Sequence, residues 1–153
     1  MKLTTKGRYA VSAMLDLACH TTHGPASLAE IAERQEISLS YLEQLFAKLR
    51  RGGLVRSVRG PGGGYLLAGS PATISVADII HAVDESIRTT ACDAADAEGH
   101  GCVRSSRCIA HNLWVELGEK IHEYLESVRL DGLAEAYRNK RSRPDHNPLE
   151  LLG

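Results

Sequence analysis

Three cysteines and one histidine lie within twenty positions of the chain and could bind a metal together: Cys92, Cys102, Cys108 and His111. The segment that carries them, residues 92–111, is rich in glycine, alanine, serine and charged residues and has almost no apolar periodicity. Burial of side chains cannot order such a segment. Thiolate sulfur and imidazole nitrogen are ligands of both zinc and iron-sulfur centres. The sequence therefore predicts a metal centre here.

Two kinds of centre fit three thiolates and one imidazole. Zinc would form a closed tetrahedral structural site. A two-iron, two-sulfide cluster also takes four protein ligands, and an imidazole in place of one thiolate makes it less negative and sensitive to pH. The spacing does not decide between the two centres. His100 lies inside the segment and competes as a ligand, but we rank it below His111, which adjoins a predicted long helix.

Composition and missing motifs restrict the class of protein. With 153 residues, 43% of them hydrophobic and 24% charged, the chain resembles an ordinary globular protein. The basic start MKLTTKGR leads into an amphipathic pattern, so we expect no signal peptide. No stretch approaches 18 apolar residues, so we expect no membrane partner and a cytoplasmic location, where reduced thiols favour metal binding over disulfides. The chain also lacks Walker, HExxH and GxSxG motifs, so we expect that it is not an enzyme.

The net charge of −1 conceals a strong asymmetry between the two halves of the chain. Residues 1–67 carry nine lysines and arginines against five acidic residues, a net charge of +4. Residues 68–153 carry nine against fourteen, a net charge of −5. The amino-terminal half can therefore face a polyanion, whereas the carboxy-terminal half would be repelled by one.

The amino-terminal part has the element order of a winged helix-turn-helix. Apolar spacing predicts a helix over residues 5–21, a short helix opened by a capping box at Ser27, and a second helix capped by Ser38. Two short apolar runs, residues 54–58 and 65–67, flank a glycine-rich stretch and predict a hairpin, the wing. The fold class is thus mainly α with a small β wing.

Beyond His111 lies the longest periodic run, which predicts a dimerisation helix over residues 113–133. Its apolar residues are spaced 3, 4, 3, 4, as in a coiled-coil seam that needs a partner helix; they are Trp114, Leu117, Ile121, Tyr124 and Val128. The expected organisation is a winged helix-turn-helix domain over 1–85, a ligand loop over 86–112, the dimerisation helix over 113–133 and a disordered tail over 134–153.

The outer face of the helix capped by Ser38 carries side chains suited to reading DNA. Glu43 can accept a hydrogen bond from a cytosine amino group and Gln44 can bind adenine through two bonds. A plain solvated helix face is the alternative. Arg59 favours the DNA interpretation, because an arginine on a glycine-rich tip suits the narrow minor groove. The predicted DNA-contacting residues are Lys6, Arg8, Tyr9, Ser38, Ser40, Tyr41, Glu43, Gln44, Lys48, Arg51, Arg59 and Gly60.

These stretches resemble the IscR family of bacterial iron-sulfur cluster-sensing transcriptional regulators. The resemblance is carried by KLTTKGRYAVSAMLDLA, SLAEIAERQEISLSYLEQLFAKLRRGGLV and VRGPGGGYLLA, followed by the three cysteines and CIAH. It covers about residues 1–130. The interval between Cys92 and Cys102 is longer than is usual in the family and contains His100.

The resemblance implies a homodimer that binds double-stranded operator DNA and represses cluster-assembly genes in its cluster-loaded form. It implies cluster donor or assembly proteins as further partners. A sibling branch senses nitric oxide through a similar cluster, and a zinc-stabilised DNA-binding protein without sensing is a further alternative. The resemblance also implies that Ser40, Glu43, Gln44 and Arg59 read bases, and that a [2Fe-2S] cluster is held by Cys92, Cys102, Cys108 and His111.

Overall fold

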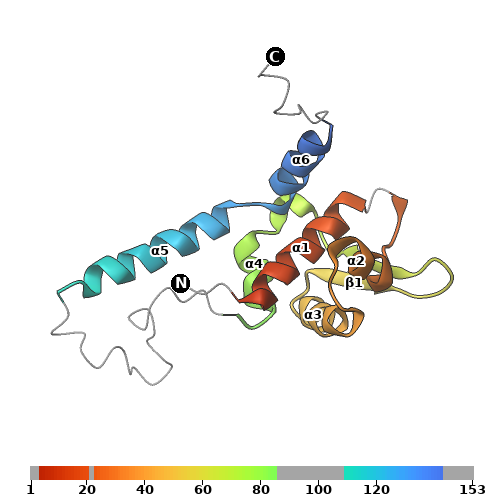
Figure 1. Ribbon diagram of the computed structural model, residues 1–153, viewed down its shortest axis with the longest axis horizontal. Helices are drawn as coiled ribbons and strands as arrows, with labels where there is room; N and C mark the ends of the chain where they lie inside the picture. Colours follow the sequence, from red (N-terminus) through yellow and green to blue (C-terminus); the bar gives the residue numbers. More distant parts are fainter. Residues whose placement is uncertain (1–3, 21–22, 86–108, 143–153) are drawn as a thin grey trace, which may run out of the picture.

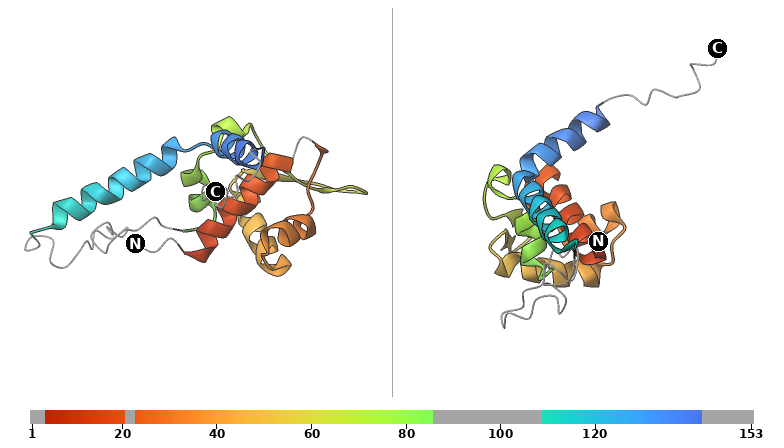
Figure 2. Two further views of the ribbon diagram at one scale, coloured as in Figure 1. Left: turned by 45° about the horizontal axis from the view of Figure 1, so that its top comes forward. Right: turned by 90° about the vertical axis from the view of Figure 1, so that its left-hand side faces the viewer.

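The structure is a computed structural model that describes residues 4–20, 23–85 and 109–142. A helical body carries a hairpin on one side and a long helix on the other, and both project away from it (Figure 1). Figure 2 shows the same opposed arrangement from a second direction. A mainly helical fold with a small β wing was predicted, and the structure confirms it. The elements are α1 (Thr5–His20), α2 (Leu28–Gln35), α3 (Leu39–Arg51), β1 (Val55–Val58), β2 (Gly64–Leu67), η2 (Pro71–Thr73), α4 (Val76–Ala82), α5 (His111–Ser127) and α6 (Leu130–Arg141).

Local sequence signals begin and orient the helices as predicted. The Ser27 side chain accepts a hydrogen bond from the backbone of Glu30 at 3.2 Å, and the Glu30 carboxylate accepts one from the backbone of Ser27 at 2.8 Å. The same reciprocal box between Ser75 and Asp78 opens α4. Both boxes satisfy amide groups that a helix start leaves without partners. Glu36 takes a left-handed conformation, which turns the chain from α2 into α3.

The core lies between α1, α3 and α4. One face of α3 is fully or almost fully buried in it, as the spacing predicted: Leu42, Leu45, Phe46 and Leu49. Met14 and Leu17 of α1 and Ile79 of α4 pack in the same cluster. The wing joins this core through Tyr65, whose ring centroid lies 4.9 Å from that of Phe46 in an edge contact. Burial of one helix face therefore fixes both α3 and the wing.

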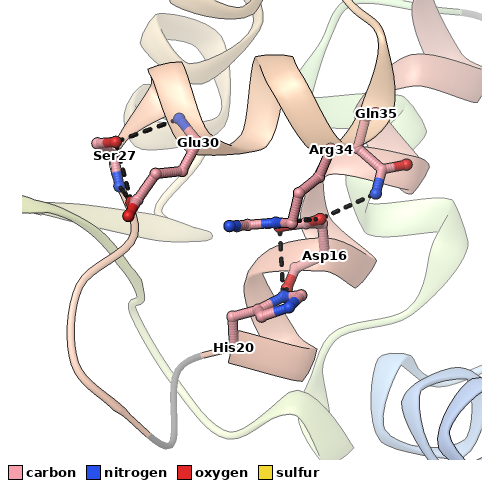
Figure 3. Close-up of polar contacts among 6 residues, drawn as sticks. All are labelled: Asp16, His20, Ser27, Glu30, Arg34 and Gln35. Carbon is pink, nitrogen blue, oxygen red and sulfur yellow. Dashed lines mark hydrogen bonds and ion pairs between the residues drawn. The ribbon is translucent and has the colours of Figure 1, made fainter.

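A buried carboxylate holds α2 against α1 (Figure 3). Asp16 has a side chain only 1% exposed, and Arg34 donates to both its oxygens, at 2.7 Å to Oδ1 and 3.0 Å to Oδ2. The Gln35 amide donates to the same Oδ2 at 2.8 Å. The Asp16 carboxylate is thereby fully paired, which a buried charge requires. The Asp16 side chain thus holds α2, the first helix of the helix-turn-helix, against α1.

The long periodic run does not form one helix over residues 113–133, contrary to our prediction. Helix α5 ends at Ser127, because Val128 and Arg129 take extended conformations. The Val128 carbonyl accepts from the amide of Val76, and the Leu130 amide donates to the Ile74 carbonyl at 2.9 Å. This short backbone pairing joins the end of α5 to the start of α4. No helix in the described ranges is long and apolar enough to cross a membrane.

The expectation of a disordered tail is wrong for residues 134–141, which continue helix α6. Leu130 is fully buried and Ala134 is 2% exposed, because α6 packs on α1. Two apolar residues one turn apart anchor the helix although its other side chains are mostly polar. Residues 143–153 lie outside the described part of the chain.

Replacing Asp16 with alanine should lower the free energy of unfolding by about 2–3 kcal/mol, because the Arg34 guanidinium and the Gln35 amide would lose their buried partner. Replacing Ser27 with alanine, which removes one exposed cap, should cost about 1 kcal/mol. Urea unfolding followed by circular dichroism at one fixed protein concentration compares the two. Equal losses in the two variants would contradict the anchoring role of Asp16.

Candidate nucleic-acid interface and metal ligands

The outer face of α3 is polar and open to solvent. Ser38 caps the helix by accepting from the amide of Tyr41 at 3.3 Å. Ser40, Glu43 and Gln44 are exposed on the side opposite the buried leucines. Within the described residues Glu43 has no hydrogen bond or ion pair. These three side chains can therefore reach a ligand without breaking an internal contact, and their contact with DNA stays a prediction.

The wing presents Arg59 and Gly60 at an exposed tip. Strands β1 and β2 pair antiparallel from Val55 opposite Leu67 to Val58 opposite Gly64. Gly60 has a φ of +100°, which only glycine adopts easily, and its carbonyl accepts from the Gly63 amide at 2.9 Å. The glycines thus permit the turn conformation. Because glycine has no side chain, Arg59 has the largest side chain at the tip of the wing.

The position of the wing relative to α2 and α3 is also fixed. Tyr65 and Ala26 exchange backbone hydrogen bonds at 2.8 and 3.0 Å. A side chain at Gly64 would collide with the Ala26 carbonyl, so glycine permits this close approach. The exposed tip of the wing and the exposed face of α3 consequently belong to one rigid unit, as simultaneous contact with two grooves requires.

The predicted contacts on α1 divide into two kinds. Arg8 is exposed, and Tyr9 is 38% exposed with its ring 6.0 Å from that of Tyr41 in an edge contact. Tyr41 is half-buried, so these rings join the start of α1 to the start of α3. Lys6 instead points to the end of α4, where it donates to the Asp84 carbonyl at 3.4 Å.

Lys48 differs from the other predicted phosphate contacts, because it already has an acidic partner. Its ammonium group lies 2.8 Å from Oδ2 of Asp84. The hydrogen bond from Lys48 lowers the pKa of Asp84, and the same bond raises the pKa of Lys48. Arg51 and Arg59, by contrast, are exposed and have no ion pair within the described residues.

Sequence reasoning missed two charged residues at this surface. Arg56 is exposed on β1, and its place beside the apolar Val55 in a short predicted strand was the sequence signal that could have revealed it. Asp84 pairs with a lysine 36 positions earlier. No local pattern indicates a contact between residues so far apart.

The predicted metal ligands fall mostly outside the described residues. Cys92, Cys102 and Cys108 lie there, as does His100. Within the described ranges, no group of three or more His, Cys, Asp or Glu side chains could hold a metal. The ligand set therefore stays a prediction.

His111 is described, and its surroundings fit a ligand. It is the first residue of α5 and is half-buried. Its Nδ1 atom is buried and has no hydrogen-bond partner among the described residues. An unpaired buried ring nitrogen is costly unless a donor or a metal satisfies its lone pair. The histidine thus has a nitrogen available for coordination at the start of a rigid helix.

A helix-turn-helix followed by a wing, with a polar outer face and exposed arginines, defines a winged-helix DNA-binding protein. Residues 3–136 match the Rrf2 family, described as iron-dependent transcriptional regulators. The chain belongs to this Rrf2 family and is a DNA-binding regulator of transcription.

Similar proteins include several regulators named IscR. The IscR of Xenorhabdus nematophila is 49% identical over 162 residues, which cover 99% of this chain and 96% of that protein. The IscR of Pectobacterium carotovorum is 55% identical over 133 residues, 87% of this chain and 79% of that protein. These relatives are transcriptional regulators, in agreement with the prediction that the chain is not an enzyme.

Two solved structures show the same fold. T. potens IscR matches with a TM-score of 0.76 and 39% identity, over 95% of each chain. CymR, the global cysteine regulator of B. subtilis, matches with a TM-score of 0.72 and 35% identity, over 89% of this chain and 98% of its own. The fold is therefore shared by differently named proteins.

Replacing Glu43 with alanine should relax the choice of DNA site in protein prepared without a metal centre. A carboxylate that faces bases without a cytosine amino group is left unpaired, and its removal should reduce discrimination between operator variants by about 1–3 kcal/mol. Binding to a panel of duplexes that differ at single base pairs measures this. Glu33→Ala, which removes an exposed acid from α2, is the control, and unchanged discrimination in Glu43→Ala would refute the role.

Proposed function

We propose that this protein is an iron-sulfur cluster-sensing regulator that binds promoter DNA as a homodimer and represses cluster-assembly genes in its cluster-loaded form. The observation that carries the proposal is the position of His111. Its Nδ1, which is buried and has no hydrogen-bond partner among the described residues, lies at the first residue of α5, a helix with no buried residue. A ligand at this position connects a metal centre directly to a rigid element.

The donor set is Cys92, Cys102, Cys108 and His111. Three thiolates suit iron and sulfide, and the match to relatives named IscR supports a [2Fe-2S] cluster over zinc. When bound, such a cluster supplies reversible electron transfer and a lability that reports cluster supply or oxidants. The imidazole of His111 contributes a neutral ligand whose availability depends on its being deprotonated.

A second copy of the chain is the proposed partner of α5. No residue of this helix is buried, although it carries Trp114, Leu117 and Tyr124, which are 38%, 41% and 67% exposed. Large exposed apolar side chains in one stripe of a helix indicate an association surface. Pairing of two α5 helices about a two-fold axis would bury the stripe and place two winged domains on two half-sites.

Helix α4 connects α5 to the elements that we propose read DNA. Backbone hydrogen bonds join Val128 to Val76 and Leu130 to Ile74, at the start of α4. Helix α4 packs in turn on α1 and α3. A change in how two α5 helices meet would therefore move each winged domain as a unit and alter which half-site spacing fits.

Anaerobically purified protein should be red-brown and contain equal iron and sulfide. His111→Ala should lose or alter the visible absorption, because one ligand is removed, whereas His100→Ala should keep it. Visible absorption spectra with iron, sulfide and zinc analyses of wild type and both variants test this. A colourless wild type with one zinc per chain would instead identify a zinc-stabilised regulator without sensing and refute the cluster.

Leu117→Lys should weaken dimerisation on the order of 100-fold or more, since the substitution removes apolar contact at both copies of a two-fold interface. Analytical ultracentrifugation over a range of protein concentrations measures the dissociation constant. Glu119→Lys lies on the exposed face away from the stripe and serves as the control. A dimer equally stable in Leu117→Lys would show that α5 is not the interface.

A further inference from the structure

A cluster of charges forms where the end of α4 meets α3 and the start of α1. Lys48 of α3 donates to Oδ2 of Asp84 at 2.8 Å, and Lys6 of α1 donates to the carbonyl of the same residue at 3.4 Å. Two ammonium groups from the predicted phosphate-contacting set thus converge on a single aspartate.

The cluster borders a surface hollow of about 320 Å³ between the ends of α3 and α4. The close approach of the two helices is set by Gly52, where a Cβ would lie 2.9 Å from Cβ of Ala82. Asp84 supplies the acidic group of a lining that is otherwise basic or neutral. The lining residues are Lys48, Arg51, Gly52, His81, Ala82 and Asp84.

The backbone delivers the Asp84 carboxylate to this place. Asp84 has a φ of +56°, just beyond the end of α4, and its amide donates to the His81 carbonyl at 3.0 Å. The next residue, Glu85, accepts from the amide of Thr4 at 2.6 Å and so ties the same segment to the start of α1. These contacts hold the backbone from which the Asp84 side chain extends.

The ion pair between Lys48 and Asp84 is short, at 2.8 Å, and open to water. The Asp84 side chain is 75% exposed and that of Lys48 is 28% exposed. Ion pairs with one partner so open to water contribute little to stability. Partial burial lowers the pKa of Lys6, and the neighbouring Lys48 lowers it further.

We propose that Asp84 is an internal counter-ion that competes with a DNA backbone phosphate for Lys48 and so limits sequence-independent affinity. With Arg51 beside it, the hollow without the Asp84 charge would be a cationic site of the kind that binds phosphate. Asp84 thereby raises the ratio of specific to non-specific binding without touching a base. The inference rests on the DNA-binding part of the proposed function and is independent of the metal centre.

Salt-dependent binding to a random-sequence 30-base-pair duplex tests the proposal, because phosphate contacts do not depend on sequence. Asp84→Asn removes the charge and keeps a residue type that tolerates the left-handed conformation. It should bind roughly threefold to tenfold more tightly than wild type at low salt. The slope of log affinity against log salt should steepen by about one unit. Lys48→Gln should flatten the slope strongly in the Asp84→Asn background and only slightly in wild type.

Glu123→Gln is the matched control, because it removes a carboxylate of the same charge from an exposed ion pair with Lys120 on α5. If Asp84→Asn binds like Glu123→Gln, or more weakly than wild type with an unchanged circular dichroism spectrum, the proposal is overturned. Asp84→Gly, which also accepts a positive φ, replaces Asp84→Asn if the latter does not fold. A wild type that binds no duplex at low salt would refute DNA binding itself, a failure distinct from that of the counter-ion.

Discussion

Burial of one face of α3 is the constraint on which the reading elements depend. Phe46 is fully buried at the centre of the core and also contacts the Tyr65 ring of the wing, so one aromatic side chain joins the two elements that a winged helix brings to DNA. Because the apolar residues of α3 lie on one side, the hydrophobic effect itself turns Glu43 and Gln44 toward solvent. The exposure of the reading face is thus a consequence of core packing and needs no separate device.

Helix α5 differs from α3, because none of its residues is buried within the chain. A single amphipathic helix of this length gains little stability alone, because helices in proteins are stabilised mainly by packing of their apolar face. Its attachment to the body through the backbone of Val128 and Leu130, followed by the packing of α6 on α1, holds the base of the helix and leaves its apolar stripe available. In the proposed dimer, α5 of a second chain is the partner that covers this stripe.

Local signals allowed most of the fold to be predicted, and contacts distant in sequence account for the errors. The capping box at Ser27 and the helix capped by Ser38 each depend on residues within one or two helical turns, and both were confirmed. The break after Ser127 depends on pairing with residues more than fifty positions earlier, so periodicity alone extended the helix too far. The pairing of Asp84 with Lys48 escaped prediction for the same reason. The cysteine ligands stay predictions, because they lie outside the described residues.

The distribution of charge explains how a protein with a net charge of −1 can still bind a polyanion selectively. Long-range attraction to DNA depends on local fields, and the exposed arginines of the wing and of the end of α3 supply them. A regulator that must find a few sites among very many non-specific ones gains nothing from unlimited attraction to phosphate. In our proposal, Asp84 beside Lys48 and Lys6 reduces that attraction where no base is read, and Glu43 would reduce it at the predicted reading face. Carboxylates at these two positions would then act in the same direction, toward selectivity and away from affinity.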